Sequence, residues 1–388
     1  MQQQLAAAAR NAHQEMVQWR RYLHENPEIT WQEYETTEWI ARWLDQWNVP
    51  YIRPAATGLV GIITGNRPGP TVAVRADIDA LPIHEENTFS FASKRPGAMH
   101  ACGHDGHTAS LLGLTRFLSQ NRDFPGTVKL LFQPAEEGGA GALKFVEAGV
   151  LDDVSACIGV HLMSTLPTGQ VSITEGPAMA ASDGFTARIQ GKGGHAASPH
   201  QAVDPIVVAC AAVMNLQTIV SRRVDPIKSA VITIGSIHAG QAANVIPDSV
   251  EIKASIRSFD PEVRQQLHDE VIRTLEGTCA VYGATVQVEY RFGYPCVNND
   301  PAITDVLREA SAEVVGEANV LKAAPIMGSE DFAYYSQKCP SSFLFVGAMN
   351  PEEGANWPHH HPRFTVDEAA LPHSMEILGR AALKLLGK

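Results

Sequence analysis

The first half of the chain alternates between two spacings of apolar residues. Short apolar runs bounded by glycine and proline predict strands, whereas apolar residues three and four apart predict helices. The predicted strands are 58–65, 71–77, 127–134 and 155–162. The predicted helices are 13–26, which Pro27 ends, 37–47, 108–120 with Thr108 as its N-cap, and 141–149. Strands that alternate with helices in this way predict an α/β layer with a largely parallel sheet.

The spacing changes at Asp183. Six predicted elements then follow in the order β-α-β-β-α-β, which is typical of a ferredoxin-like module. They are 183–191, 202–220, 229–237, 249–259, 261–283 and 285–293. After Pro295 the chain returns to helix and strand and finishes with a long helix from Val366. The pattern therefore predicts one α/β domain, residues 1–182 and 295–388, interrupted by a smaller domain, residues 183–294.

Composition narrows the class of protein. A chain of 388 residues exceeds what one hydrophobic core usually supports, which agrees with two domains. The formal net charge of −12 argues against nucleic acid and anionic membrane as partners. No apolar run approaches the roughly 20 residues of a membrane-spanning helix. Six cysteines lack the spacing of a disulfide framework, so we expect reduced thiols and a cytoplasmic location.

The segment MHACGHDGHTA, residues 99–109, raises the question of a metal site. Cys102 and His104 are two residues apart, and an extended segment would place both side chains on one side. Thiolate and imidazole are ligands for zinc and related metals. Taken alone, such a pair is more often incidental than functional.

Further residues of the ligand type strengthen the hypothesis. Most follow predicted strands, whose carboxyl ends hold the sites of open α/β sheets. They are Asp77 and Asp79, Glu136 and Glu137, His161, and His359 to His361. Each has a simpler explanation by itself, such as a turn, a helix start or a solvated loop. Together they predict a metal site.

The order of motifs along the chain resembles the M20 metallopeptidase and aminoacylase family. The resemblance is to its amidohydrolase branch, which includes auxin-conjugate hydrolases, hippurate hydrolases and other N-acyl amino acid amidohydrolases. The similar segments cover nearly the whole chain; they are RRYLHENPE, VAVRADIDALPI, HACGHDGHTA, FQPAEEGGAGA, GVHL, GKGGHAASPH, ANVIPDS, GSEDFAYY, HHPRF and DEAAL. The resemblance implies a metallo-exopeptidase-type catalytic domain with an inserted lid and dimerisation domain.

The resemblance also implies a site with two divalent metal ions per subunit, which could be Zn, Mn, Co or Ni. The implied metal ligands are Cys102, His104, Glu137, His161 and His360. His359 or His361 could replace His360, because three histidines are consecutive. Asp79 corresponds to an acid that orients a metal ligand. Peptidase relatives carry a bridging aspartate near Cys102 and a histidine near Asp77, and this sequence departs from them at both places.

The implied reaction is hydrolysis of the amide bond of an N-acyl amino acid, with an N-acetyl or N-benzoyl group favoured. Glu136 corresponds to the general base that serves a metal-activated water. His195 corresponds to a histidine that stabilises the oxyanion in the active site of a neighbouring subunit. Asn244 and Arg257 correspond to residues that hold the substrate carboxylate. The resemblance thus implies a homodimer or a dimer of dimers.

Three alternatives remain open from the sequence. One is a two-metal dipeptidase or aminopeptidase of the same family. A second is a hydrolase that uses Cys102 as its nucleophile, which would leave Glu136, Glu137 and His360 without a role. The third is a metal-binding protein without catalytic activity, which does not account for Glu136.

Overall fold

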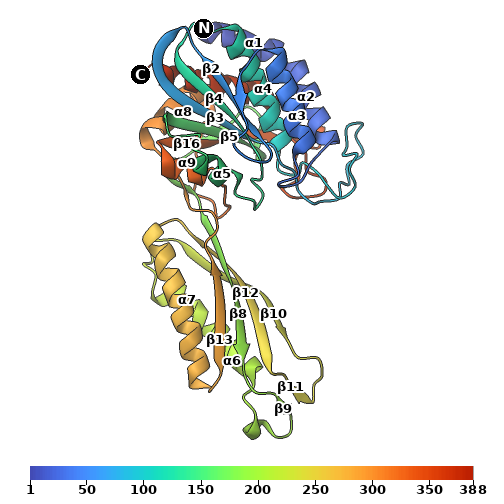
Figure 1. The fold of residues 1–388 in the computed structure, drawn as a ribbon, viewed down its shortest axis with the longest axis vertical. Coiled ribbons are helices and arrows are strands. Elements are labelled where there is room, and N and C mark those ends of the chain that lie inside the picture. The colour runs from blue at the N-terminus through green and yellow to red at the C-terminus, as the bar shows by residue number, and fades with distance from the viewer. Residues whose placement is uncertain (388) are drawn as a thin grey trace. The chain divides into compact units, whose positions relative to one another are not determined.

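The computed structural model describes residues 1–387 and divides into two compact units (Figure 1). Unit 1 comprises Met1–Ala178, Asn298–Ala324 and Asp331–Lys388. Unit 2 comprises Met179–Val297 together with the short segment Pro325–Glu330. The sequence-based boundaries lie at 182/183 and 294/295, and the segment Pro325–Glu330 was not among the residues expected in the inserted domain.

Unit 1 is built on a mixed eight-stranded sheet in the order β1-β2-β4-β3-β5-β16-β6-β15. Its four central strands, β4, β3, β5 and β16, run parallel to one another, as the alternation of strands and helices predicts. The strands are β1 Tyr51–Ile52, β2 Leu59–Thr64, β3 Arg67–Asp77, β4 Pro125–Gln133, β5 Val154–Pro167, β6 Val171–Ile173, β15 Val320–Lys322 and β16 Ser341–Met349. Two further short strands, β7 Gly176–Met179 and β14 Val297–Asn299, form a separate pair.

Alternate residues of the central strands face opposite sides of this sheet. Val72, Val74 and Ala76 of β3 enter the main hydrophobic core, which also contains side chains of α1, α2, α4, α8 and α10. Arg75 and Asp77 therefore face the opposite side. The helices are α1 Gln2–Asn11, α2 His13–Glu25, α3 Tyr34–Gln46, α4 His104–Gln120, α5 Gly141–Glu147, α8 Pro301–Val315, α9 Ala333–Lys338 and α10 Ala370–Leu386.

Three sequence-based details are wrong. The helix expected from Thr108 begins one turn earlier at His104, because Gly103 adopts a left-handed conformation, φ 92°, and ends the preceding bend. Cys102 and His104 consequently do not share an extended segment. The final helix begins at Ala370 rather than Val366. His161 lies inside β5 instead of at its end, since β5 continues to Pro167 alongside β16.

Unit 2 has the predicted β-α-β-β-α-β order and a four-stranded antiparallel sheet in the order β10-β12-β8-β13. Its hydrophobic core is formed by the sheet and two helices. The main elements are β8 Ala181–Gln190, α6 Pro205–Arg222, β10 Ala230–Ala239, β12 Ser249–Ser258, α7 Pro261–Val281 and β13 Thr285–Arg291. A small pair, β9 Gly194–His195 and β11 Val245–Ile246, lies beyond one end of this sheet (Figure 1).

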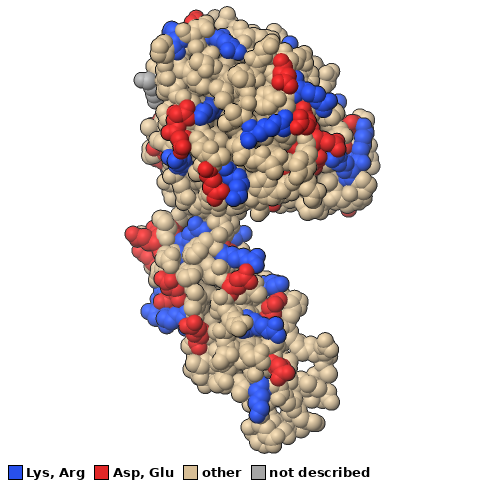
Figure 2. Space-filling model, in the orientation of Figure 1, with Lys and Arg blue, Asp and Glu red and all other residues tan. Residues whose placement is uncertain are grey.

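One helix, α6, is long and apolar enough to span a membrane by length and composition alone. The sequence had not predicted an apolar segment of this length. One face of α6 packs in the core of unit 2 through Val208, Ala212, Leu216 and Ile219, as expected for an amphipathic core helix. On the face drawn in Figure 2, acidic and basic side chains are interspersed over both units.

Candidate metal centre

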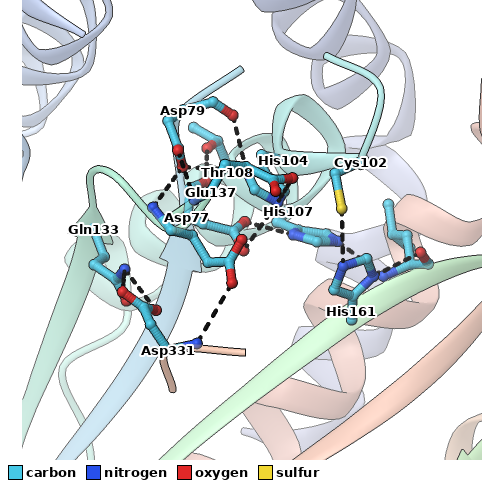
Figure 3. Close-up of polar contacts among 12 residues, drawn as sticks. Asp77, Asp79, Cys102, His104, His107, Thr108, Gln133, Glu137, His161 and Asp331 are labelled. Carbon is cyan, nitrogen blue, oxygen red and sulfur yellow. Dashed lines mark hydrogen bonds and ion pairs between the residues drawn. The ribbon is translucent and has the colours of Figure 1, made fainter. Parts of the chain in front are cut away.

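Unit 1 gathers the predicted metal ligands beside the carboxyl ends of β3 and β4. Figure 3 shows four of them, Cys102, His104, Glu137 and His161. Cys102 lies in the bend before α4, and His104 is the first residue of that helix. Glu137 lies in the turn after β4, and His161 projects from β5. His360 comes from the segment that precedes α10.

Distances between ligand atoms join all five predicted ligands into one cluster. Cys102 Sγ lies 3.4 Å from His161 Nε2. Glu137 Oε1 lies 3.3 Å from His360 Nε2 and 3.9 Å from His104 Nε2. In each of three overlapping sets the ligand atoms lie within 4.8 Å of one another: Cys102, His104 and His161; Cys102, Glu137 and His360; His104, Glu136 and Glu137. These sets share members, so the ligand atoms form one continuous cluster.

The three consecutive histidines have different surroundings. His359 is turned towards the backbone oxygen of Leu162, 3.0 Å from its Nε2. His361 stacks on Trp357 and accepts a hydrogen bond from the backbone of Arg363. Of these three histidines, only His360 belongs to a group of side chains that could hold a metal ion among residues 1–387. Its φ of 65° is unusual for a residue with a side chain, and strain of this kind is concentrated at functional sites.

Asp79 shapes the turn that carries the paired glutamates. Its two carboxylate oxygens accept the backbone N–H groups of Glu136 and Glu137, each at 3.0 Å. Its backbone oxygen lies 2.8 Å from His104 Nδ1, which leaves Nε2 of that ring to face the cluster. Ala135, just before the turn, has a φ of 56°. Asp79 therefore fixes the ring of His104 and the Glu136–Glu137 turn. Its role as the acid that orients a metal ligand stays a prediction from the resemblance.

Two buried atoms test whether a metal fits here. His104 Nε2 and Glu137 Oε1 have no hydrogen-bond partner among residues 1–387. Their nearest polar neighbours are at ion-pair distance: His104 Nε2 lies 3.4 Å from Asp77 Oδ2, and Glu137 Oε1 lies 3.3 Å from His360 Nε2. A bound cation would give both buried atoms a partner. Burial lowers the pKa of His104, but the charges of Asp77, Asp79 and Glu137 outweigh that effect and raise it to about 10. A site that attracts positive charge this strongly, with sulfur, nitrogen and oxygen donors, fits divalent cations.

Glu136 lies against the predicted ligands and differs from them in its own contacts. It is only 6% exposed, and its Oε1 accepts the backbone N–H of Asp331 at 3.4 Å. Glu136 and Glu137 each bring a carboxylate oxygen within 4.8 Å of the other and of a His104 nitrogen, so one can bind metal while the other handles a proton beside it. Asp331 belongs to the GSEDF segment, for which the sequence assigned no individual role.

Sequence reasoning missed three buried polar residues beside the centre, namely Arg75, His107 and Gln133. Asp77 accepts from Arg75 Nη1 at 2.7 Å and lies 2.6 Å from His107 Nδ1. His107 Nε2 in turn accepts the backbone N–H of Leu162, the residue after His161. Of these three residues, only Arg75 could have been noticed in the sequence. It is a charged residue within the apolar run of β3, on the face of the strand away from the main core.

The three predicted residues of the inserted domain all lie in unit 2. His195 and Asn244 are close together at β9 and β11, where Val245 pairs with His195 and the backbone oxygen of Asn244 accepts from Ala196. Arg257 lies at the other end of β12, which begins at Ser249. Arg257 is eight positions after Ser249 along β12. At the ~3.3 Å that a strand rises per residue, the two residues are about 26 Å apart. Asn244 and Arg257 of one chain are therefore too far apart to hold one carboxylate.

The environment of Cys102 argues against a nucleophilic role. Burial, followed by the negative charges of Glu137, Glu136 and Asp77, raises the pKa of its thiol well above the ordinary value. Nucleophilic cysteines need a lowered pKa, usually from a neighbouring cation or a helix N-terminus. His161, the imidazole nearest to the sulfur, has a pKa lowered well below its usual value by burial and by the neighbouring His107 and His359.

Comparison with known proteins gives consistent matches. The chain matches the sequence profile of peptidase family M20/M25/M40 over residues 73–384. It is 45% identical to N-acetyl-L-cysteine deacetylase of Bacillus subtilis (strain 168), covering 95% of this chain and 87% of that protein. It is 42% identical to IAA-amino acid hydrolase ILR1-like 4 of Arabidopsis thaliana, covering 96% and 86%.

Solved structures agree in fold. A putative aminohydrolase from methicillin resistant Staphylococcus aureus has a TM-score of 0.94 and 41% identity, with both chains covered completely. A Bacillus subtilis protein described as a dinuclear metal binding peptidase from the M20 family has a TM-score of 0.84 and 38% identity, covering 97% of this chain and 99% of that one. These matches confirm the predicted fold class and the resemblance on which the site residues were assigned.

Proposed function

The chain belongs to peptidase family M20/M25/M40, and on that premise we propose that it is a metal-dependent amidohydrolase that releases free amino acids from N-acyl amino acids. One observation carries the proposal. Five ligand-type side chains from distant parts of the sequence form one cluster, and a sixth residue, Glu136, places a carboxylate oxygen within 4.8 Å of the ligand atoms of His104 and Glu137.

The residues of the chain divide the chemistry among them. Cys102, His104, Glu137, His161 and His360 would hold two divalent ions. When bound, such ions supply a Lewis acid and lower the pKa of water towards neutrality. Glu136 receives the proton of the attacking water on its carboxylate and returns it to the nitrogen of the departing amino acid. Asp79 holds the turn that carries Glu136 and Glu137 by accepting both of their backbone N–H groups.

For the acyl group we propose N-acetyl or N-benzoyl. Support comes from the similarity to N-acetyl-L-cysteine deacetylase, at 45% identity, and to IAA-amino acid hydrolases, whose names specify an acylated amino acid. The ions we propose are Zn, Mn, Co or Ni, since one thiolate and several imidazoles and carboxylates suit all four.

We also propose that the protein is a homodimer, or a dimer of dimers, joined through unit 2. The outer face of α6 and the edge strand β10 expose large apolar side chains, which is unusual for a surface that stays in water. They are Ile206, Val207, Met214, Val231 and Ile237, between 37% and 68% exposed. A second copy is the occupant that we expect, because an antiparallel β10 edge can pair with itself across a two-fold axis.

The separation of Asn244 from Arg257 supports the same assembly. His195 and Asn244 lie together at one end of unit 2, and Arg257 lies at the other. All three can serve one substrate only if His195 and Asn244 come from one chain and Arg257 from its partner. For the location we propose the cytoplasm; the cysteines are all unpaired thiols in the described chain, residues 1–387, which suits a reducing compartment.

The test is a substrate panel on protein that has been stripped of metal and reloaded with Zn, Mn, Co or Ni. We expect N-acetyl, N-benzoyl or indole-acetyl amino acids to be hydrolysed faster than dipeptides, and only after metal is restored. Faster cleavage of dipeptides would indicate a peptidase. Activity that survives chelation but is lost on thiol alkylation would indicate a cysteine hydrolase, and no hydrolysis under any condition would indicate a binding protein.

A further inference from the structure

Arg75 is a fully buried cation held between two carboxylates. Its Nη1 donates to Asp77 Oδ2 at 2.7 Å, and its Nη2 donates to Asp331 Oδ1 at 3.0 Å. All three side chains are 0% exposed. Asp77 ends β3, whereas Asp331 is 256 residues away from Arg75 in the sequence. A buried ion pair is a weak source of stability, because the cost of desolvation offsets most of the attraction, so this pair calls for another explanation.

The carboxylate of Asp331 is fixed from several directions. Besides Arg75, the side-chain amide of Gln133 lies 2.9 Å from both of its oxygens. The backbone N–H of Ala142, in the first turn of α5, donates to Oδ2 at 2.9 Å. Gln133 is itself held by Arg75 Nε at 2.8 Å and by the hydroxyl of Tyr335 at 3.1 Å. Asp331 therefore has little freedom to rotate or shift.

The backbone N–H of Asp331 points at the proposed general base, Glu136. The N–H of Asp331 donates to Oε1 of Glu136 at 3.4 Å. We propose that Asp331 is a positioning residue, which the buried pair with Arg75 holds in place so that its N–H aims the carboxylate of Glu136. The proposal rests on the proposed function, in which Glu136 carries the proton.

The second arm of Arg75 reaches the metal ligands. Asp77 receives one guanidinium N–H and lies 2.6 Å from Nδ1 of His107. His107 Nε2 then accepts the backbone N–H of Leu162 at 2.8 Å and so fixes the chain next to His161. Arg75 thus connects the proposed base, Glu136, with the predicted ligand His161 through buried hydrogen bonds. This network fixes the distance between Glu136 and His161. Errors of about 1 Å in such a separation cost about a hundredfold in rate.

The first test is Asp331→Asn, which keeps the size of the side chain and an acceptor for Arg75 but turns an N–H₂ group towards the donors of Gln133 or Ala142. We expect kcat to fall by about ten- to a hundredfold, while KM, the number of bound metal ions and the affinity for the product amino acid stay unchanged. The matched control is Glu376→Gln, which breaks a largely buried carboxylate–arginine pair, that with Arg380 within α10. An unchanged kcat in Asp331→Asn, or an equal loss in the control, would overturn the proposal.

A second test needs no turnover and leaves Asp331 in place. Hydrogen exchange of the peptide containing Asp331 is compared between Glu136→Gln, which keeps an acceptor oxygen, and Glu136→Ala, which removes it. We expect one additional fast-exchanging amide in Glu136→Ala and none in Glu136→Gln. Equal protection in both variants would refute the contact that the proposal needs. Because exchange is measured without substrate, this outcome is independent of whether the proposed amidohydrolase activity is found.

Discussion

Cys102 Sγ lies 3.4 Å from His161 Nε2, although the two residues are 59 positions apart in the sequence. If both bind one metal ion, the loss of the thiolate should lower metal content. We expect Cys102→Ser to bind fewer ions per subunit by elemental analysis while keeping its secondary structure. Cys296→Ser, which changes a half-buried thiol in unit 2, should bind as many ions as the wild type. An unaltered metal count in Cys102→Ser would exclude Cys102 as a ligand.

Glu136 is expected to act on protons rather than on metal. Glu136→Gln removes the base but keeps the size and hydrogen-bonding atoms of the side chain. The kcat should fall by about 10²–10⁴-fold, the usual contribution of general acid–base catalysis, with the metal count unchanged. Glu137→Gln, which changes the neighbouring residue, should instead lower the metal count. Near-native kcat in fully loaded Glu136→Gln would show that another group is the base.

The histidine triplet can be resolved by three alanine variants. His360 Nε2 faces Glu137 Oε1 at 3.3 Å, so His360→Ala should lose metal and activity together. His361→Ala removes the stacking on Trp357 and a hydrogen bond from the backbone of Arg363, and it should retain both. His359→Ala should bind metal but lose some stability, since the half-buried ring contacts Leu162 and Phe364. Metal loss in His361→Ala with full metal in His360→Ala would move the ligand assignment by one position.

Glu33 gives the stability of the protein a specific pH dependence. Burial, together with the charge of Asp79, raises its pKa from 4.5 to about 7. The folded state therefore binds this proton more tightly than the unfolded state between those values, and stability falls as the pH rises through that range. Glu33→Gln stays neutral and lacks this loss.

The measurement is denaturant unfolding of both proteins from pH 5 to pH 8. The free energy of unfolding of Glu33→Gln, relative to that of the wild type, should increase with pH and level off above pH 7. One pKa unit corresponds to about 1.4 kcal/mol. Both proteins are measured after removal of metal, so the pH dependence of metal binding does not enter the difference. A difference that is independent of pH would mean that Glu33 titrates normally in the folded protein.

The dimer can be tested by mixing two inactive variants, His195→Ala and Glu136→Gln. If His195 serves the partner's active site, a mixed dimer has one site with both lesions and one with neither. Activity should then recover to at most about half of the wild-type value per mixed dimer. Mass measurement of the intact assembly confirms that subunits have exchanged. Confirmed mixed dimers without activity would exclude this role for His195.

A surface variant provides the matching structural test. Met214→Glu places a charge on the exposed apolar face of α6, where Met214 is 68% exposed, and should shift the protein towards monomer in light scattering. Ile227→Glu changes an 89% exposed apolar side chain outside α6 and β10 and should leave the assembly unchanged. A Met214→Glu dimer as stable as the wild type would place the interface elsewhere.

Local spacing in the sequence was enough for much of the fold. The period of apolar residues identified the β-α-β-β-α-β order of unit 2, because each element there has one buried face and one solvated face. The period of apolar residues did not predict where helices and strands begin and end, because those positions depend on single residues and on contacts with residues distant in the sequence. Gly103 let α4 begin at His104, and pairing with β16 carried β5 past His161.

The candidate ligands and the candidate base could be predicted from the sequence, because metal binding and proton transfer require particular functional groups and the order of motifs matches a family that is now shown. Tertiary structure alone decided how they are arranged. It selected His360 as the histidine that faces Glu137, separated Asn244 from Arg257 along β12, and brought Asp331 to Arg75. These relationships arise from strand pairing and loop packing between residues up to 256 positions apart, for which no local pattern exists.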